Sequence, residues 1–137
     1  MPFEHNTKVQ LYHTDSAGLL FYSKMLDLAF DAFDAFLGTC GVSIRSILQE
    51  SEYLMPYVRV EADYLSPLYV DDRLKIIIYV EKIGDTSFIL KYDFLKNKKT
   101  AGHVKTIHVT VSKKTRQKIP LPEEIRRALE SCVSSRL

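Results

Sequence analysis

The 137-residue sequence contains no tryptophan, only two cysteines and no long run of apolar residues. Cys40 and Cys132 lie far apart and form neither a C-x-x-C pair nor a cysteine–histidine pattern of the kind that binds zinc, so we expect no metal site. Two isolated cysteines without an export signal indicate reduced thiols. No apolar segment approaches the roughly 20 residues of a membrane-spanning helix. We therefore expect a cytoplasmic protein with no membrane segment.

An excess of charge of one sign is also lacking, because 19 basic and 17 acidic residues leave a net charge of +2. A nucleic-acid-binding domain usually shows a concentrated basic face, so nucleic acid is not an expected partner. Glycine and proline are scarce, with five of each, and they form no linker or repeat. A chain of this length without an internal break is expected to form one domain over residues 1–137.

A buried helix is the clearest element of the sequence. Ser23 is a suitable N-cap residue, and the helix is expected to run to about Leu37. Past the first turn its polar residues are Asp27, Asp31 and Asp34, which form one narrow stripe. A helix that is apolar over most of its circumference must be largely surrounded by protein. The stripe indicates a solvated edge of the helix; the alternative is that one aspartate lines a site.

Strands are expected on both sides of this helix in the sequence. Residues 7–13 alternate as a strand does, with Val9, Leu11 and His13 on one face. Short turns separate four later strands, expected at about residues 58–64, 74–82, 87–95 and 100–112. Strands joined in this way indicate an antiparallel sheet, and shorter helices are expected at 43–50 and 123–132. One long apolar helix and one sheet must cover each other, which predicts an α+β fold with the sheet curled around the helix.

The segment between the first strand and the helix contains the residues best suited to chemistry. Asp15 begins a run of turn formers and small residues directly before the helix. The free N–H groups of a helix N-terminus can bind the oxygen of a polarised carbonyl, and a carboxylate beside such a site suits acyl transfer. Ala17 and Gly18 leave room for a substrate to approach the backbone. The alternative is that Asp15 is a turn or capping residue.

Residues 15–22, which read D-S-A-G-L-L-F-Y, resemble the active-site signature of the 4-hydroxybenzoyl-CoA thioesterase family. In that family an aromatic-rich strand leads to D-x-x-G, then to hydrophobic residues, a tyrosine and the central helix. Residues 64–74 and 103–122 are also similar to family segments, so the resemblance covers nearly the whole chain. It implies the hotdog fold, an antiparallel sheet wrapped around one long central helix. It further implies a homodimer, or a homotetramer built from two dimers, with acyl-CoA bound between subunits.

The same resemblance assigns roles to individual residues. By position, Asp15 would be the catalytic carboxylate, acting as nucleophile or as general base for a water, and both paths stay open. Gly18 and Tyr22 would bind substrate, with a backbone N–H near Tyr22 polarising the thioester carbonyl. His13 would point to the same side of an extended strand as Asp15 and could contact the substrate or the carboxylate. The alternatives are a histidine satisfied by its neighbours and, for Tyr22, a core position.

Other polar residues give weaker indications. His103 and His108 have opposite parity on the last long strand, so they cannot share a metal. The basic stretches at 96–99 and 113–118 are either solvated turns or contacts for the phosphates of coenzyme A, and Arg59 and Arg73 are further options for such contacts.

The sequence therefore predicts hydrolysis of an acyl-CoA thioester without a cofactor. The acyl group could be aromatic, as in 4-hydroxybenzoyl-CoA or 1,4-dihydroxy-2-naphthoyl-CoA, or a short or medium chain, and an acyl-carrier-protein substrate remains open. One alternative is a hotdog 3-hydroxyacyl-thioester dehydratase. Those enzymes pair a histidine with an acid on the central helix, whereas Asp15 precedes the helix here. A second alternative is a non-enzymatic acyl-thioester-binding module, against which the presence of Asp15 argues.

Overall fold

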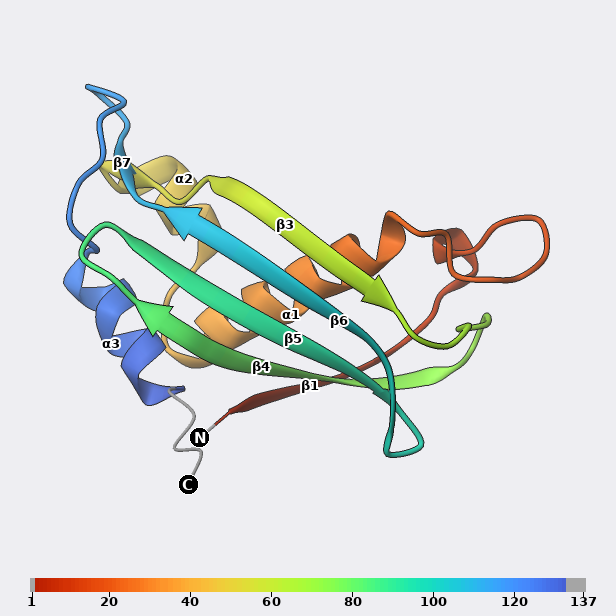
Figure 1. The fold of residues 1–137 in the computed structure, drawn as a ribbon. Helices are drawn as coiled ribbons and strands as arrows, with labels where there is room; N and C mark the ends of the chain where they lie inside the picture. Colours follow the sequence, from red (N-terminus) through yellow and green to blue (C-terminus); the bar gives the residue numbers. More distant parts are fainter. Residues whose placement is uncertain (1, 133–137) are drawn as a thin grey trace.

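The computed structural model describes residues 2–132 and contains one large antiparallel sheet with a long helix against one of its faces (Figure 1). The sheet has the strand order β1-β4-β5-β6-β3. Its strands are β1 (Phe3–Lys8), β3 (Tyr57–Tyr64), β4 (Arg73–Ile83), β5 (Ser87–Lys96) and β6 (Lys99–Val109). The helices are α1 (Lys24–Thr39), α2 (Ile44–Glu50) and α3 (Glu123–Ser131), and a small second sheet pairs β2 (Tyr53–Leu54) with β7 (Val111–Ser112).

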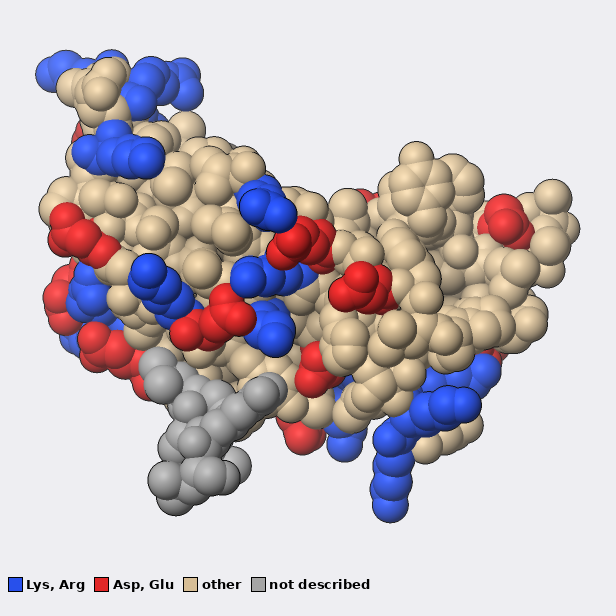
Figure 2. All heavy atoms as spheres, in the orientation of Figure 1, with Lys and Arg blue, Asp and Glu red and all other residues tan. Residues whose placement is uncertain are grey.

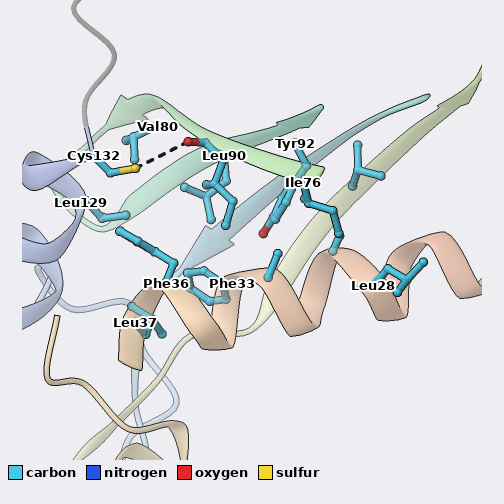
Figure 3. Packing of buried hydrophobic residues seen from close by; sticks show 14 of the residues in the cluster. Leu28, Phe33, Phe36, Leu37, Ile76, Val80, Leu90, Tyr92, Leu129 and Cys132 are labelled. Carbon is cyan, nitrogen blue, oxygen red and sulfur yellow. Dashed lines mark hydrogen bonds between the residues drawn. The ribbon is translucent and has the colours of Figure 1, made fainter. Parts of the chain in front are cut away.

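Helix α1 and the inner face of the sheet form the core (Figure 3). The helix contributes Phe33 and Phe36, and the sheet contributes side chains such as Ile76 and Tyr92, all of them buried. Burial of this much apolar surface is the main term that stabilises such a fold. Helix α3 closes one end of the core with Leu129. The prediction of an antiparallel sheet wrapped around one long helix is confirmed.

The polar stripe of α1 lies at the solvated edge of the helix, as the sequence predicts. Asp27, Asp31 and Asp34 are all exposed. Asp27 forms an ion pair with Lys24 one turn earlier, with 3.3 Å between the charged atoms. Most of the apolar residues of the helix face protein, whereas these three carboxylates and the ring of Phe30, which is 46% exposed, are accessible to water.

The first strand differs from its prediction. Strand β1 ends at Lys8, and residues Leu11–His13 form a short 3-10 turn instead of extending the strand. The backbone N–H of Gln10 donates to Nδ1 of His13 at 2.9 Å, and this bond closes the turn. Leu11 is consequently 75% exposed, whereas Val9 and His13, which were expected on the same face of a strand, are buried. The prediction of a strand over residues 7–13 is therefore wrong beyond Lys8, and the strand begins earlier than expected, at Phe3.

The last long strand is also interrupted. Strand β6 stops at Val109, and the hydroxyl of Thr110 donates to the backbone carbonyls of Thr86 and Ile119. After this break, β7 pairs with β2 and leaves the large sheet.

None of the helices in residues 2–132 combines the length and the apolar character that a membrane-spanning helix needs.

Candidate active site

The loop between the 3-10 turn and α1 is closed by its own backbone hydrogen bonds. The N–H of Asp15 donates to the carbonyl of Leu19 at 2.9 Å, and the N–H of Gly18 donates to the carbonyl of Asp15 at 3.0 Å. Gly18 has φ +77°, a left-handed conformation that side-chain-bearing residues rarely adopt. A glycine at this position therefore allows the loop to turn back on itself.

The carboxylate of Asp15 is exposed and is held by this loop. Its Oδ1 accepts hydrogen bonds from the N–H groups of Ala17 at 2.8 Å and Leu19 at 3.2 Å. Across residues 2–132, no protein group donates to Oδ2. One oxygen thus fixes the orientation of the carboxylate, and the other remains accessible to a substrate or a water.

Asp15 lies at the edge of a pocket of about 340 Å³ that also reaches the first turn of α1. The pocket is lined by Asp15, Leu19, Leu20, Met25, Tyr64, Leu65, Ser66, Pro67 and Leu68. The hydroxyl of Tyr64 donates to the backbone carbonyl of Tyr22, directly before the helix. The pocket therefore joins the carboxylate to the start of α1.

The amide end of α1 has free donors. Ser23 occupies the N-cap position, but its side chain makes no capping hydrogen bond. The N–H groups of Lys24 and Leu26 bond to the carbonyls of Phe21 and Ser23. The N–H groups of Tyr22, Ser23 and Met25 have no acceptor in the part of the chain that the structure describes. Such donors, together with the positive end of the helix dipole, attract a developing negative charge.

His13 does not lie beside Asp15. The expectation that both point to one side of a strand is wrong, because residues 11–13 form the 3-10 turn. The ring of His13 is buried, packs against Tyr12 and accepts the N–H of Gln10. Burial lowers its pKa below the ordinary value, although the nearby carboxylates of Asp31 and Asp27 oppose this effect. His13 therefore resembles the histidine satisfied by its neighbours that was the alternative interpretation.

The other two sequence-derived candidates are accessible. Tyr22 is 67% exposed, so its alternative role as a core residue is wrong, and its ring lies next to that of Phe21. Gly18 has open space where a side chain would project. Tyr64 was missed as a site residue, and the signal that could have identified it is its place at the start of the family-like segment 64–74.

A second, mostly apolar pocket of about 220 Å³ lies between α1 and the edge strand β3. It is lined by Leu26, Asp27, Ala29, Phe30, Tyr57, Val60, Val104 and Thr106. Strand β3 pairs with β6 on one side only within the described residues. It exposes Val58 and Val60, whose exposed fractions are 57% and 41%. The edge of the sheet next to this pocket is thus both unpaired and apolar.

The two basic stretches lie at opposite ends of β6 (Figure 1). The stretch at 96–99 forms the β5–β6 hairpin, and Lys96 bonds to Asp72. In the stretch at 113–118, Lys113 donates to the carbonyls of Ile47 and Leu48 at the end of α2. Arg59 pairs with Glu61, and Arg73 lines a shallow pocket near the hairpin. Several of these cations therefore have structural partners, and contact with phosphates stays a prediction.

The face of the sheet turned away from α1 carries charges of both signs (Figure 2). Lys91 and Lys105 pair with Glu81, and His103 pairs with Asp93 at 2.7 Å. His103 and His108 lie on opposite faces of β6, as predicted, because His108 points into the core. Among residues 2–132, no group of three or more His, Cys, Asp or Glu side chains could hold a metal ion.

The sequence is similar to those of known proteins. The family model described as the thioesterase-like superfamily matches residues 9–129. The 1,4-dihydroxy-2-naphthoyl-CoA hydrolase of Rippkaea orientalis is 30% identical over 135 residues, which cover 96% of this chain and 98% of that protein. The enzyme of the same name from Synechococcus elongatus is 28% identical over 124 residues, which cover 90% of this chain and 91% of that protein.

Solved structures show the same fold. The crystal structure of a 1,4-dihydroxy-2-naphthoyl-CoA thioesterase from Synechocystis superposes with a TM-score of 0.89 at 23% identity, covering 94% of this chain and 96% of that one. A gentisyl-coenzyme A thioesterase superposes with a TM-score of 0.83 at 23% identity, covering 93% of this chain and 99% of that one.

Proposed function

The chain belongs to the thioesterase-like superfamily, and on this premise we propose that it hydrolyses an aromatic acyl-CoA thioester with Asp15 as the catalytic carboxylate. The protein is an acyl-CoA thioester hydrolase. Its preferred substrate is 1,4-dihydroxy-2-naphthoyl-CoA, supported by full-length similarity to hydrolases of that name. The observation that carries the role of Asp15 is the pocket that it shares with the open amide end of α1.

The proposed reaction uses the two functional groups at this pocket, the carboxylate of Asp15 and the amide end of α1. The thioester carbonyl oxygen binds the free N–H groups at the start of α1, which stabilise the negative charge of the tetrahedral intermediate. Oδ2 of Asp15 either attacks the carbonyl carbon or takes a proton from an attacking water. In the first case the carbon–sulfur bond breaks, the thiolate leaves, and water hydrolyses the mixed anhydride. In the second case hydroxide adds directly, and the proton passes to the departing thiolate.

We also infer a homodimer in which β3 of one copy pairs with β3 of a second. An unpaired edge strand that exposes apolar side chains is a surface that proteins normally cover. Val58 and Val60 form such a surface beside the apolar pocket near α1. Acyl-CoA then binds between subunits. The mixed charges on the outer face of the sheet suit a second, more polar contact in a dimer of dimers.

Residues 1–137 form one domain in this proposal, and the enzyme works in the cytoplasm without a cofactor. Support for a reducing compartment comes from Cys40 and Cys132, which are both free thiols. Gly18 and Tyr22 flank the bound thioester, because Gly18 keeps the approach to the loop open and the exposed ring of Tyr22 can cover an aromatic acyl group. His13 is the weakest of the three substrate-binding candidates, because its ring is buried and already accepts the N–H of Gln10.

The test is release of free thiol from a panel of acyl-CoA thioesters. The panel contains 1,4-dihydroxy-2-naphthoyl-CoA, 4-hydroxybenzoyl-CoA, short and medium fatty acyl-CoA and one acyl-carrier-protein thioester. We expect the naphthoyl substrate to have the highest kcat/KM. Asp15→Asn should reduce kcat by about 10³-fold or more, as removal of a reacting group generally does. Asp34→Asn is the matched control, since Asp34 is an exposed aspartate on α1, and it should leave kcat unchanged.

Other outcomes point elsewhere. Near-normal turnover by Asp15→Asn would remove Asp15 from the mechanism. Binding of acyl-CoA without thiol release from any substrate would favour the binding module. Conversion of a 3-hydroxyacyl-CoA to an enoyl-CoA would favour the dehydratase. Incorporation of ¹⁸O from solvent water into Asp15 during turnover would identify the nucleophilic path over the general-base path.

A further inference from the structure

A partly buried ion pair lies at the turn of residues 69–72, next to the loop that carries Asp15. Nζ of Lys96, on the β5–β6 hairpin, is 2.8 Å from Oδ2 of Asp72 and lies 5.6 Å from the centre of the Tyr69 ring. The side chains of Lys96 and Asp72 are 32% and 18% exposed. Among the described residues, no other lysine or arginine ion pair has both partners so well covered.

The carboxylate of Asp72 also holds the backbone of its own turn. The N–H of Tyr69 donates to Oδ2 of Asp72 at 2.7 Å, and the N–H of Asp72 donates to the carbonyl of Tyr69 at 3.0 Å. Burial alone would raise the pKa of Asp72, but the hydrogen bonds from Lys96 and Tyr69 and the charge of Lys96 lower it. Residues 69–72 are thus fixed by one carboxylate that is itself fixed by Lys96.

This turn is joined directly to the catalytic loop. The N–H of Leu20 donates to the carbonyl of Leu68 at 2.8 Å, and the N–H of Val70 donates to the carbonyl of Gly18 at 3.0 Å. Between these two bonds, Leu19 forms a β-bridge with Tyr69. The N–H of Leu19 is in turn one of the two donors that orient the carboxylate of Asp15.

We propose that Lys96 and Asp72 are positioning residues, whose ion pair holds residues 68–72 in place and thereby fixes the carboxylate of Asp15. This role rests on the catalytic role of Asp15 proposed above. The neighbouring ion pair Lys8–Asp71 is less able to hold residues 68–72 in place. Its side chains are 42% and 74% exposed, and among the described residues the carboxylate of Asp71 accepts no hydrogen bond from residues 15–20. Exposed pairs contribute little because solvent screens them.

The proposal gives Lys96 a different role from contact with the phosphates of coenzyme A. A phosphate contact would act on substrate affinity and only on substrates that carry the nucleotide. A positioning role acts on the geometry of the reacting group, and a displacement of about 1 Å can cost up to roughly 100-fold in rate. It therefore lowers kcat for every thioester, with or without the nucleotide.

The kinetic test compares Lys96→Met with Lys96→Arg, using the same acyl group as its CoA thioester and as its N-acetylcysteamine thioester. We expect Lys96→Met to lower kcat about tenfold on both substrates with KM unchanged, while Lys96→Arg, which keeps the charge, stays within about twofold of the parent protein. Lys8→Met is the matched control, because it removes an ion pair of the same turn, and it should retain full kcat. A raised KM confined to the CoA thioester, or an unchanged kcat, would overturn the proposal.

A second measurement does not depend on turnover. Amide hydrogen exchange, followed by NMR, should become at least about threefold faster at Leu20 and Val70 in Lys96→Met, because their bonds join the two segments. Exchange at Tyr92 in the core should not change. If the parent protein hydrolyses no thioester, the proposed function fails but this exchange result still decides the structural coupling. Equal exchange rates in Lys96→Met and the parent protein would refute the coupling itself.

Discussion

The ring of His108 stacks on the ring of Phe88 in the core, with 4.6 Å between the centroids and 7° between the planes. The rings of Tyr57 and Phe33 also lie close to this imidazole, with centroid distances of 4.2 Å and 5.2 Å. Its Nε2 lies 2.9 Å from the hydroxyl oxygen of Thr106, and its Nδ1 has no hydrogen-bond partner in residues 2–132. Burial lowers the pKa of His108 to about 4, although the nearby backbone of Met55 opposes this effect, so the ring is neutral in the folded protein at neutral pH.

The burial of His108 should make the folded protein less stable in mild acid. Below its ordinary pKa of 6.5, His108 takes up a proton in the unfolded chain but not in the folded one, so protons favour unfolding. The free energy of unfolding should fall by about 3 kcal/mol between pH 6.5 and pH 4, at roughly 1.4 kcal/mol per pKa unit. Urea unfolding at fixed protein concentration would measure it. His108→Phe should flatten most of this slope, leaving a smaller one from His13; an unchanged slope would contradict the assignment.

A methyl group at Gly102 is expected to destabilise the protein. A Cβ there would lie 2.7 Å from Cε of Met25 and 2.8 Å from the backbone carbonyl oxygen of Asp63. Gly102→Ala should therefore lower the free energy of unfolding by about 2 kcal/mol, the usual cost of forcing atoms into a packed core. Gly38→Ala is the control, because nothing lies within 4 Å of its added Cβ. Chemical denaturation would measure both, and equal stability of the two variants would show that this contact relaxes freely.

A charge at Val60 should prevent association through β3. Val60 is 41% exposed on the unpaired edge strand and lines the apolar pocket beside α1. Val60→Glu would place a carboxylate in the inferred interface, where burial without a partner is costly. Analytical ultracentrifugation should show dimers for the parent protein and monomers for the variant. Leu48→Glu, a similar change at an exposed position of α2, should leave the dimer intact, and a Val60→Glu dimer would exclude this edge.

Removal of the Tyr64 hydroxyl should slow the reaction. This hydroxyl donates to the carbonyl of Tyr22 directly before α1. A tyrosine hydroxyl is protonated at neutral pH, and burial raises the pKa of Tyr64 further, so the group is a donor there. Tyr64→Phe should lower kcat about tenfold by loosening the amide end of the helix, with stability changed by about 1 kcal/mol or less. Steady-state kinetics and thermal unfolding measure the two effects. A normal kcat would show that Tyr64 serves only the fold.

Much of the fold could be predicted, because the periodicity of apolar residues in the sequence agrees with their burial in the structure. Helix α1 and strands β3 to β6 appear within two residues of their predicted bounds at most ends, since long apolar patterns and turn residues marked them. The first strand was mispredicted, since it spans Phe3–Lys8 and not residues 7–13. A hydrogen bond from Gln10 to the His13 side chain forms a turn that the alternation of apolar residues does not reveal. The end of β6 depends on Thr110, whose two partners are distant in sequence.

The candidate site was only partly predictable for the same reason. Asp15 and Gly18 stand three positions apart in one recognisable motif, so the local sequence indicated them. Tyr64 and the pair Lys96–Asp72 reach the loop through contacts across the sheet, and the sequence gives no direct sign of such contacts. The sequence also suggested a capping role for Ser23, whereas the uncapped helix start is what leaves donors free.

Strand β1 pairs with β4, and the loop at 15–20 pairs with residues 68–70. These pairings affect the order in which parts of the protein fold during synthesis. The nascent chain emerges from the ribosome with its N-terminal loop first, yet the partners that shape this loop are translated about fifty residues later. A chain stalled before residue 68 therefore carries the motif without its geometry, and catalytic competence arrives late in synthesis.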